Sequence, residues 1–156
     1  MSYKMKIMTE QRAREILSWR YPSPYDLYNG EITEEAIKEF MDNPYYVIYQ
    51  KDELIGFYCK EFAAQVPVGY FFQAYPEGYL DFGLGMKPEH TGKGNGTAFL
   101  QYILATLKKE EEKPLRLTVA EFNTRAITLY EKFDFQKVSA FTNADDLVFW
   151  IMTEKR

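Results

Sequence analysis

Three glycines that alternate along a short segment are the residues best suited to chemistry. Gly92, Gly94 and Gly96 lie in the run Met86-Lys-Pro-Glu-His-Thr-Gly-Lys-Gly-Asn-Gly-Thr97, between an apolar stretch and a long amphipathic one. Glycine lets a backbone approach a ligand closely because no side chain intervenes. The first N–H groups of a helix lack intrahelical acceptors, and the helix dipole favours an anion there. The spacing therefore predicts a phosphate or pyrophosphate site, with Lys93 adding positive charge.

Two common phosphate-binding motifs do not fit this segment. A P-loop requires glycine, four residues and then Gly-Lys-Ser/Thr, whereas here Gly94 follows Lys93 and Lys87 stands at the position of the first glycine. The dinucleotide fingerprint G-x-G-x-x-G fails because its last glycine would come one residue after Gly96. A nucleotide kinase is therefore disfavoured. A tight strand-to-helix turn that needs glycine only for its geometry is the structural alternative.

The apolar stretch before the turn has two different faces if it forms a strand. Alternation places Leu80, Phe82, Leu84 and Met86 on one face, and Asp81, Gly83 and Gly85 on the other. Glycine within a strand often marks the close approach of a ligand or another backbone. Asp81, on this face without bulky side chains, could take a proton from an amine, and Glu61 on the preceding predicted strand is a second candidate. An ordinary polar residue without a part in the reaction explains Asp81 equally well.

A polar pair follows the next predicted strand. Asn123 and Tyr130 are seven residues apart, so both lie on one face of a helix, about two turns from each other. Asn123 is suited to cap that helix. A helical tyrosine is usually a core residue, so the spacing alone assigns no chemistry to Tyr130.

Together these segments resemble the GNAT N-acetyltransferase superfamily. Gly94 and Gly96 match the two glycines of the family's pyrophosphate motif, Gln/Arg-x-x-Gly-x-Gly/Ala, and Pro88 matches the proline usual before it. Thr91 stands where Gln or Arg is expected, and polar Asn95 stands where an apolar residue is common. The backbone N–H donors are unaffected by both departures.

The resemblance continues along the second segment. Asn123, Ala126, Tyr130 and Phe135 match an Asn, Ala, Tyr and Gly-Phe pattern of the family, with Asp134 in place of the glycine. In the family the tyrosine hydroxyl lies near the thioester sulfur and can protonate the leaving thiolate, and the asparagine contacts the pantetheine or assists on the amine side. Tyr130 is thus expected to be the general acid.

The resemblance implies an acetyl-CoA-dependent N-acetyltransferase that works by direct attack in a ternary complex, without a metal. The expected catalytic residues are Tyr130 and Asp81. The expected contacts to acetyl-CoA (coenzyme A) are Leu84, Gly85, Met86, Thr91, Gly92, Lys93, Gly94, Asn95, Gly96, Thr97, Asn123 and Tyr130. A non-catalytic acyl-CoA-binding or regulatory domain on the same fold is the alternative, and it needs neither catalytic residue.

The acceptor is expected to be a small-molecule or peptide amine. Its predicted contacts are Tyr21, Tyr25, Asp26, Tyr28 and Asp81, because aromatic rings and a carboxylate suit an apolar or cationic group. The region 65–79 should line the same side. These tyrosines could equally be packing residues or a homodimer surface.

The elements that must position these residues form one predicted domain over residues 1–156, of mixed α/β class with a splayed central sheet. Periodicity, caps and breakers predict strands at 3–7, 45–50, 54–63, 79–86, 115–120, 135–141 and 147–152, and helices at 9–19, 33–41, 94–109 and 123–132. The segment 65–78 is expected to be loop with some strand. The family's central strand, 79–86 here, is expected to run beside 115–120.

Composition excludes several other classes. The net charge of −4 gives no electrostatic footprint for nucleic acid or an anionic membrane. Cys59 is the only cysteine, so neither an intrachain disulfide nor a cysteine-based zinc site can form. With no apolar run of transmembrane length, the chain is expected to be cytoplasmic.

Acetyl-CoA binding gives the first test. We expect calorimetric titration of acetyl-CoA to show saturable binding that the Gly94→Glu substitution abolishes, because a carboxylate would enter the space for the pyrophosphate and repel it. No binding by the folded, unsubstituted protein would indicate that Thr91 marks a decayed cofactor site.

Overall fold

Seven strands and four α-helices follow one another along residues 2–155, the part of the chain that the computed structural model describes. The strands are β1 (Tyr3–Ile7), β2 (Tyr45–Gln50), β3 (Glu53–Lys60), β4 (Leu80–Met86), β5 (Leu115–Ala120), β6 (Phe135–Thr142) and β7 (Val148–Glu154). The helices are α1 (Glu10–Ser18), α2 (Glu34–Asp42), α3 (Gly96–Glu110) and α4 (Thr124–Lys132). Four short 3₁₀ helices in this described part are η1 (Tyr25–Tyr28), η2 (Glu61–Ala64), η3 (Pro67–Phe72) and η4 (Pro88–His90). None of these helices has the length and apolar character that crossing a bilayer requires.

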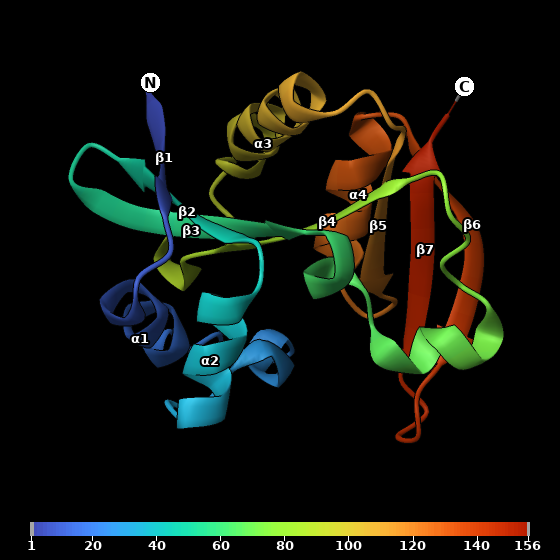
Figure 1. Cartoon of the computed structure of the whole chain (residues 1–156), viewed down its shortest axis with the longest axis horizontal. Helices are drawn as coiled ribbons and strands as arrows, with labels where there is room; N and C mark the ends of the chain where they lie inside the picture. The colour runs from blue at the N-terminus through green and yellow to red at the C-terminus, as the bar shows by residue number, and fades with distance from the viewer. Residues whose placement is uncertain (1, 156) are drawn as a thin grey trace. The chain divides into compact units, whose positions relative to one another are not determined.

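Strand pairing follows the order β1-β2-β3-β4-β5-β7-β6 (Figure 1). β4 and β5 are parallel, with Leu80 opposite Leu115 and Asp81 opposite Arg116, and α3 makes the crossover between them. The pairs β1–β2, β2–β3, β5–β7 and β6–β7 are antiparallel. The predicted mixed α/β class and the predicted neighbour of the central strand are confirmed. The predicted splay of the sheet stays a prediction.

The chain divides into two compact units. Unit 1 comprises Met1–Cys59 and Leu84–Ile103, and unit 2 comprises Lys60–Gly83 and Leu104–Arg156. The division falls inside β4 and inside α3, so each of these elements begins in one unit and ends in the other. That the two units make up one domain stays a prediction.

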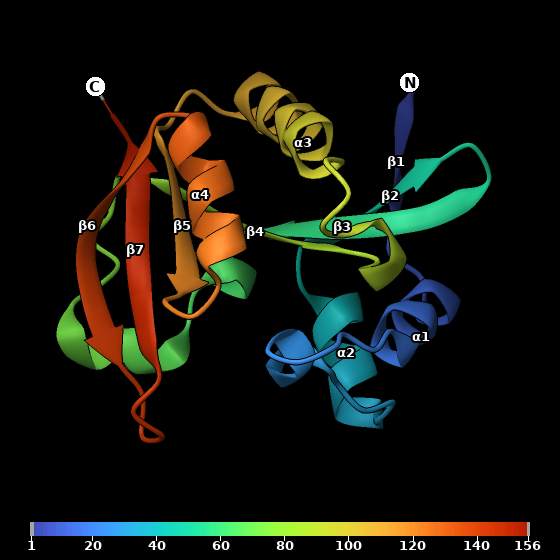
Figure 2. The same cartoon turned by 180° about the vertical axis from the view of Figure 1, so that it is seen from behind.

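In unit 1, α1 and α2 lie on one side of the β1–β3 sheet, and the start of α3 lies on the other (Figures 1 and 2). Both N-terminal helices begin at a threonine cap. Thr9 Oγ1 accepts a hydrogen bond from the Arg12 N–H at 3.2 Å, and Thr33 Oγ1 accepts one from the Ala36 N–H at 3.1 Å. The core beneath them contains Ile16, Trp19, Val47 and Leu54.

In unit 2, α4 covers one face of the β5–β7–β6 sheet and η3 covers the other (Figures 1 and 2). A cluster of buried apolar residues fills the η3 side, namely Ala74, Phe141 and Ile151, with Val66, Val68, Tyr75 and Phe149 packed against it. Phe135 meets the rings of Phe82 and Tyr130, with centroids 5.9 Å and 6.3 Å away. The elements that carry the predicted site residues of unit 2 are therefore packed against one another.

Several boundaries lie one or two residues from their expected positions, as in β7, and three differences concern the segments near the site. β3 ends at Lys60 rather than at residue 63, because Glu61 has a φ of 61° that leaves the strand conformation. The segment 65–78 contains η3 and no strand. α3 begins at Gly96 rather than Gly94, since φ is 71° at Gly92 and 80° at Gly94, outside the helical region.

Atoms of unit 1 lie so close to Gly56 that one added methyl group is expected to lower the stability of the protein. A Cβ at Gly56 would lie 2.4 Å from Phe99 Cζ and 2.6 Å from the Gly85 carbonyl oxygen. Because that oxygen belongs to the backbone, we expect Gly56→Ala to lower the free energy of unfolding by roughly 1–3 kcal/mol. Urea denaturation measures it. Gly30→Ala is the control, since its Cβ meets only the flexible Leu17 Cδ2, at 3.1 Å, and equal losses in both variants would contradict the packing argument.

Candidate functional site

The glycine turn lies in unit 1 between the end of β4 and the start of α3. Gly92 and Gly94 adopt left-handed φ angles, and a Cβ on Gly94 would meet no atom within 4 Å. Packing therefore does not require glycine at position 94, where a side chain would have room, but the left-handed backbone conformation favours it. Thr91 donates its hydroxyl to the Pro88 carbonyl at 2.7 Å, so its side chain shapes the turn. The exposed Lys93 lies between the two left-handed glycines.

The N-terminus of α3 offers backbone donors. The first bond of the helix runs from the Phe99 N–H to the Asn95 carbonyl at 3.2 Å, so the N–H groups of residues 96–98 precede the ladder. Asn95 occupies the capping position, but its amide nitrogen donates to the His90 carbonyl at 3.1 Å. With the Asn95 side chain turned away, this end of the helix suits an anionic group.

Packing within unit 1 accounts for one of the glycines in β4, the strand before the turn. A Cβ on Gly85 would lie 2.3 Å from Phe57 Cε1, so the Phe57 ring fills the space that the missing side chain leaves. Glycine at position 85 therefore has a structural reason that the alternation of the strand could not reveal. The end of the strand is also tied down, because the Tyr21 hydroxyl donates to the Met86 carbonyl at 2.7 Å.

The predicted acceptor residues of unit 1 lie on the segment between α1 and α2. Tyr21 is half-buried, and its ring meets that of Tyr28 edge to face with the centroids 6.4 Å apart. Tyr25, Asp26 and Tyr28 belong to η1, where Asp26 and Tyr28 are exposed. The hydroxyl of Tyr21 is thus hydrogen-bonded to the end of β4, and its ring lies against Tyr28 in this exposed turn.

Asp81 lies in unit 2 at the start of β4, and it is ion-paired. Arg116 donates from Nε to Asp81 Oδ1 and from Nη2 to Oδ2, each at 2.7 Å. Both residues are only 3% exposed. Gln65 Nε2 donates to Oδ2 as well, at 2.9 Å. The carboxylate therefore accepts three hydrogen bonds within a buried fork-to-fork pair.

The Arg116 guanidinium is surrounded on its other sides. It donates to the Pro76 carbonyl at 2.8 Å and lies over the rings of Tyr75 and Tyr79, at 5.3 Å and 4.7 Å from their centroids. Burial raises the pKa of the Tyr75 phenol above its usual value. Arg116 lies opposite Asp81 in the pairing of β4 with β5, and the sequence analysis did not identify Arg116 as a site residue.

Glu61, the second candidate base, is not on the strand. It is exposed and begins η2 in a left-handed conformation. Its predicted position on the strand is wrong, because the chain turns out of β3 at that residue.

In unit 2, Asn123 immediately precedes α4 and Tyr130 lies within it, in agreement with the helix predicted at 123–132. Asn123 is the N-cap, with Oδ1 accepting from the Ala126 N–H at 3.2 Å. Tyr130 is buried, 7% exposed, and its ring packs edge to face on Phe135. Both residues therefore have structural roles, and their predicted contacts to a cofactor stay predictions.

The two units thus divide the predicted site residues between them. Unit 1 holds the glycine turn, Leu84 to Met86 and the tyrosine segment, whereas unit 2 holds Asp81, Asn123 and Tyr130. Gln65 and Arg116 are the polar partners that sequence reasoning missed. Strand register could have indicated Arg116, but an amide reaching Asp81 from a 3₁₀ segment leaves no periodic signal.

Comparison with known proteins identifies the relatives of the chain. Residues 11–135 match the family model described as the acetyltransferase (GNAT) family. No curated protein sequence gives a significant match.

Among solved structures, the aminoglycoside acetyltransferase AAC(6')-Ib in complex with paromomycin and acetyl-CoA is 20% identical, with a TM-score of 0.76, and the match covers 100% of this chain and 94% of that one. A spermidine N-acetyltransferase SpeG chimera from Vibrio cholerae and hSSAT is 19% identical, with a TM-score of 0.72 and coverage of 97% and 94%. An N-acetyltransferase from Staphylococcus aureus Mu50 is 17% identical, with a TM-score of 0.64 and coverage of 99% and 100%. At these identities the likeness shows the fold.

The buried ion pair predicts a large effect on stability. We expect Asp81→Asn and Arg116→Met each to lower the free energy of unfolding by about 3–5 kcal/mol, because each leaves a charged partner buried without its counter-ion. Denaturant titration measures the loss. The double variant should lose less than the sum of the single losses, and strict additivity would contradict direct pairing.

Proposed function

Because the chain belongs to the GNAT acetyltransferase family, we propose that it transfers the acetyl group of acetyl-CoA to an amine by direct attack in a ternary complex. The observation that carries this proposal is the glycine turn, with its left-handed Gly92 and Gly94 before the backbone donors of α3. These donors suit the pyrophosphate of coenzyme A. Related structures were crystallised with coenzyme A or acetyl-CoA.

The proposed cofactor contacts follow from the resemblance. The pyrophosphate would take the turn from Thr91 to Thr97, with Lys93 supplying charge. The pantetheine would follow the backbone of β4 from Leu84 to Met86. Asn123 is proposed to contact the same arm or assist on the amine side. On this part of β4 the Gly85 carbonyl oxygen is directed toward β3, where it would lie 2.6 Å from a Cβ at Gly56.

The proposed reaction is an acyl transfer between two heteroatoms. The neutral amine nitrogen attacks the thioester carbonyl carbon, the carbon–sulfur bond breaks, and the amine gives up a proton. Backbone N–H groups of β4 would polarise the carbonyl. Tyr130 would protonate the departing thiolate, while the proximity of amine and thioester supplies much of the acceleration.

Asp81 is the proposed base, and its ion pair sets a condition on that role. Protonation of Asp81 would leave the Arg116 guanidinium buried without its counter-ion, which is costly. A chain of water molecules that accepts the amine proton avoids this cost. The two routes differ in the activity of Asp81→Asn, because only a water chain lets the folded variant keep its turnover.

The proposed acceptor is a small-molecule or peptide amine. Relatives with the same fold include aminoglycoside and spermidine acetyltransferases. Tyr21, Tyr25, Asp26 and Tyr28 are proposed contacts, and the exposed carboxylate of Asp26 would suit a cationic acceptor. A cytoplasmic location is proposed with it, since a chain with one cysteine needs no oxidising compartment. A homodimer, and the absence of nucleic-acid and membrane partners, stay predictions.

A panel of amines with acetyl-CoA tests the activity directly. The panel contains polyamines, aminoglycosides, amino acids and peptides, and release of the coenzyme A thiol is measured. Turnover of at least one amine supports the proposal. Saturable acetyl-CoA binding without turnover of any of them would favour the non-catalytic acyl-CoA-binding alternative.

The hydroxyl of Tyr130 gives the sharpest prediction. We expect Tyr130→Phe to lower kcat roughly ten- to hundredfold, because the thiolate would leave without its proton donor but is itself a good leaving group. The KM for acetyl-CoA should change much less. The substitution keeps the ring that packs on Phe135.

Tyr102→Phe on α3 is the matched control and should leave kcat unaltered. Equal kcat values for Tyr130→Phe and the unsubstituted enzyme would remove the general-acid assignment.

A further inference from the structure

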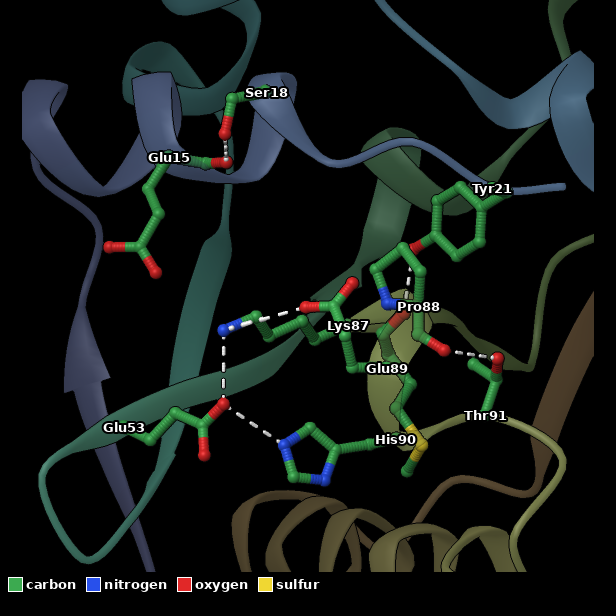
Figure 3. A network of polar contacts seen from close by, with 10 residues as sticks. Glu15, Ser18, Tyr21, Glu53, Lys87, Pro88, Glu89, His90 and Thr91 are labelled. Carbon is green, nitrogen blue, oxygen red and sulfur yellow. Dashed lines mark hydrogen bonds and ion pairs between the residues drawn. The ribbon is translucent and has the colours of Figure 1, made fainter.

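Three charged or titratable side chains meet beside the glycine turn, on residues that the reaction does not use (Figure 3). Glu53, the first residue of β3, lies with Oε2 3.0 Å from Lys87 Nζ and 3.0 Å from His90 Nε2. Lys87 immediately precedes the short helix η4, which leads into the turn, and His90 is the last residue of that helix. One carboxylate oxygen thus contacts both ends of this segment.

The charges of this cluster support each other. Hydrogen bonds from His90 and Lys87 hold the pKa of Glu53 below its usual value, and the bond to Glu53 raises the pKa of Lys87. Glu89, with its carboxylate 3.6 Å from the Lys87 ammonium, and Glu15 of α1 also face Lys87 and favour its charged form. Glu53 is therefore a carboxylate and Lys87 a cation throughout the neutral pH range.

Hydrogen bonds of the backbone connect this cluster to β3 and to the start of α3. The Lys87 N–H donates to the Ile55 carbonyl of β3 at 2.7 Å. The His90 carbonyl accepts from Asn95, the capping residue of α3. His90 is thus held by Glu53 through its side chain and holds the start of the helix through its carbonyl. Gly92 and Gly94, which lie between these points, have the greatest conformational freedom of any residue.

We propose that Glu53 is a positioning residue for the pyrophosphate-binding turn, acting through His90 and Lys87. This inference rests on the proposed function of the turn. A glycine-rich loop loses conformational entropy when it closes on a ligand, and anchoring its entry in the bound arrangement reduces that loss. Glu53 does not touch the cofactor in this proposal, so its effect falls on the affinity for acetyl-CoA and not on the chemical step.

The sign of the effect separates positioning from simple charge. Removal of a negative charge near a polyanionic cofactor should tighten binding through long-range electrostatics. Loss of positioning should weaken it. We expect Glu53→Ala to raise the Kd for acetyl-CoA roughly three- to tenfold in calorimetry, with kcat nearly unchanged. Glu53→Gln keeps a hydrogen-bond acceptor and should recover part of the loss.

Asp52→Ala is the matched control. It removes the same charge from the neighbouring exposed position of the same hairpin, and its Kd should be unchanged or lower. Hydrogen–deuterium exchange of the amides of residues 91–96 in the ligand-free protein gives an independent readout, with faster exchange expected in Glu53→Ala alone.

The outcomes are distinct. Weaker binding and faster exchange in Glu53→Ala, with neither in Asp52→Ala, support the inference. Unchanged affinity in Glu53→Ala, or a fall in kcat without a change in Kd, overturns it and leaves the proposed function intact. No acetyl-CoA binding by the unsubstituted protein overturns the proposed function, and the positioning role with it.

Discussion

The buried ion pair between Asp81 and Arg116 is the interaction on which the framework of unit 2 depends. It lies on the parallel pairing of β4 and β5, where Asp81 is opposite Arg116 in the register. Two buried charges are tolerated only when the geometry is good and the remaining polar atoms are satisfied. Gln65 and the Pro76 carbonyl provide that satisfaction, and both come from the irregular segment between β3 and β4. The pair therefore fixes strand register and a long connection at the same time.

In unit 1 the corresponding constraint is close backbone approach. Gly56 of β3 leaves room for the Phe99 ring and the Gly85 carbonyl, while Gly85 leaves room for Phe57. These contacts bring aromatic rings against strand backbones and fix the end of β4 that leads into the turn. The glycines of the turn serve a different purpose, because Gly94 faces open space in a left-handed conformation. Gly85 and Gly94 are close together in the sequence, but packing favours glycine at position 85 and the backbone conformation favours it at position 94.

The polar side chains around the turn mostly shape it. Thr91 bonds to Pro88, Asn95 bonds to His90, and Glu53 bonds to His90 and Lys87. The backbone N–H groups at the start of α3 do not depend on the side chains of Thr91 and Asn95. Thr91 and Asn95, which stand where the family commonly has other residues, therefore leave these donors unchanged.

Local sequence determined most of the elements and the position of the turn. Caps, the alternation of β4 and the glycine spacing act over a few residues, so Asn123 caps its helix as predicted, and Thr9 and Thr33 cap the helices predicted from those positions. Only the tertiary structure decided what those residues meet. The pairing of Asp81 with Arg116, the Phe57 ring beside Gly85 and the contact of Glu53 with His90 join residues 28 to 37 positions apart. Such contacts depend on strand register and packing, which no local pattern encodes.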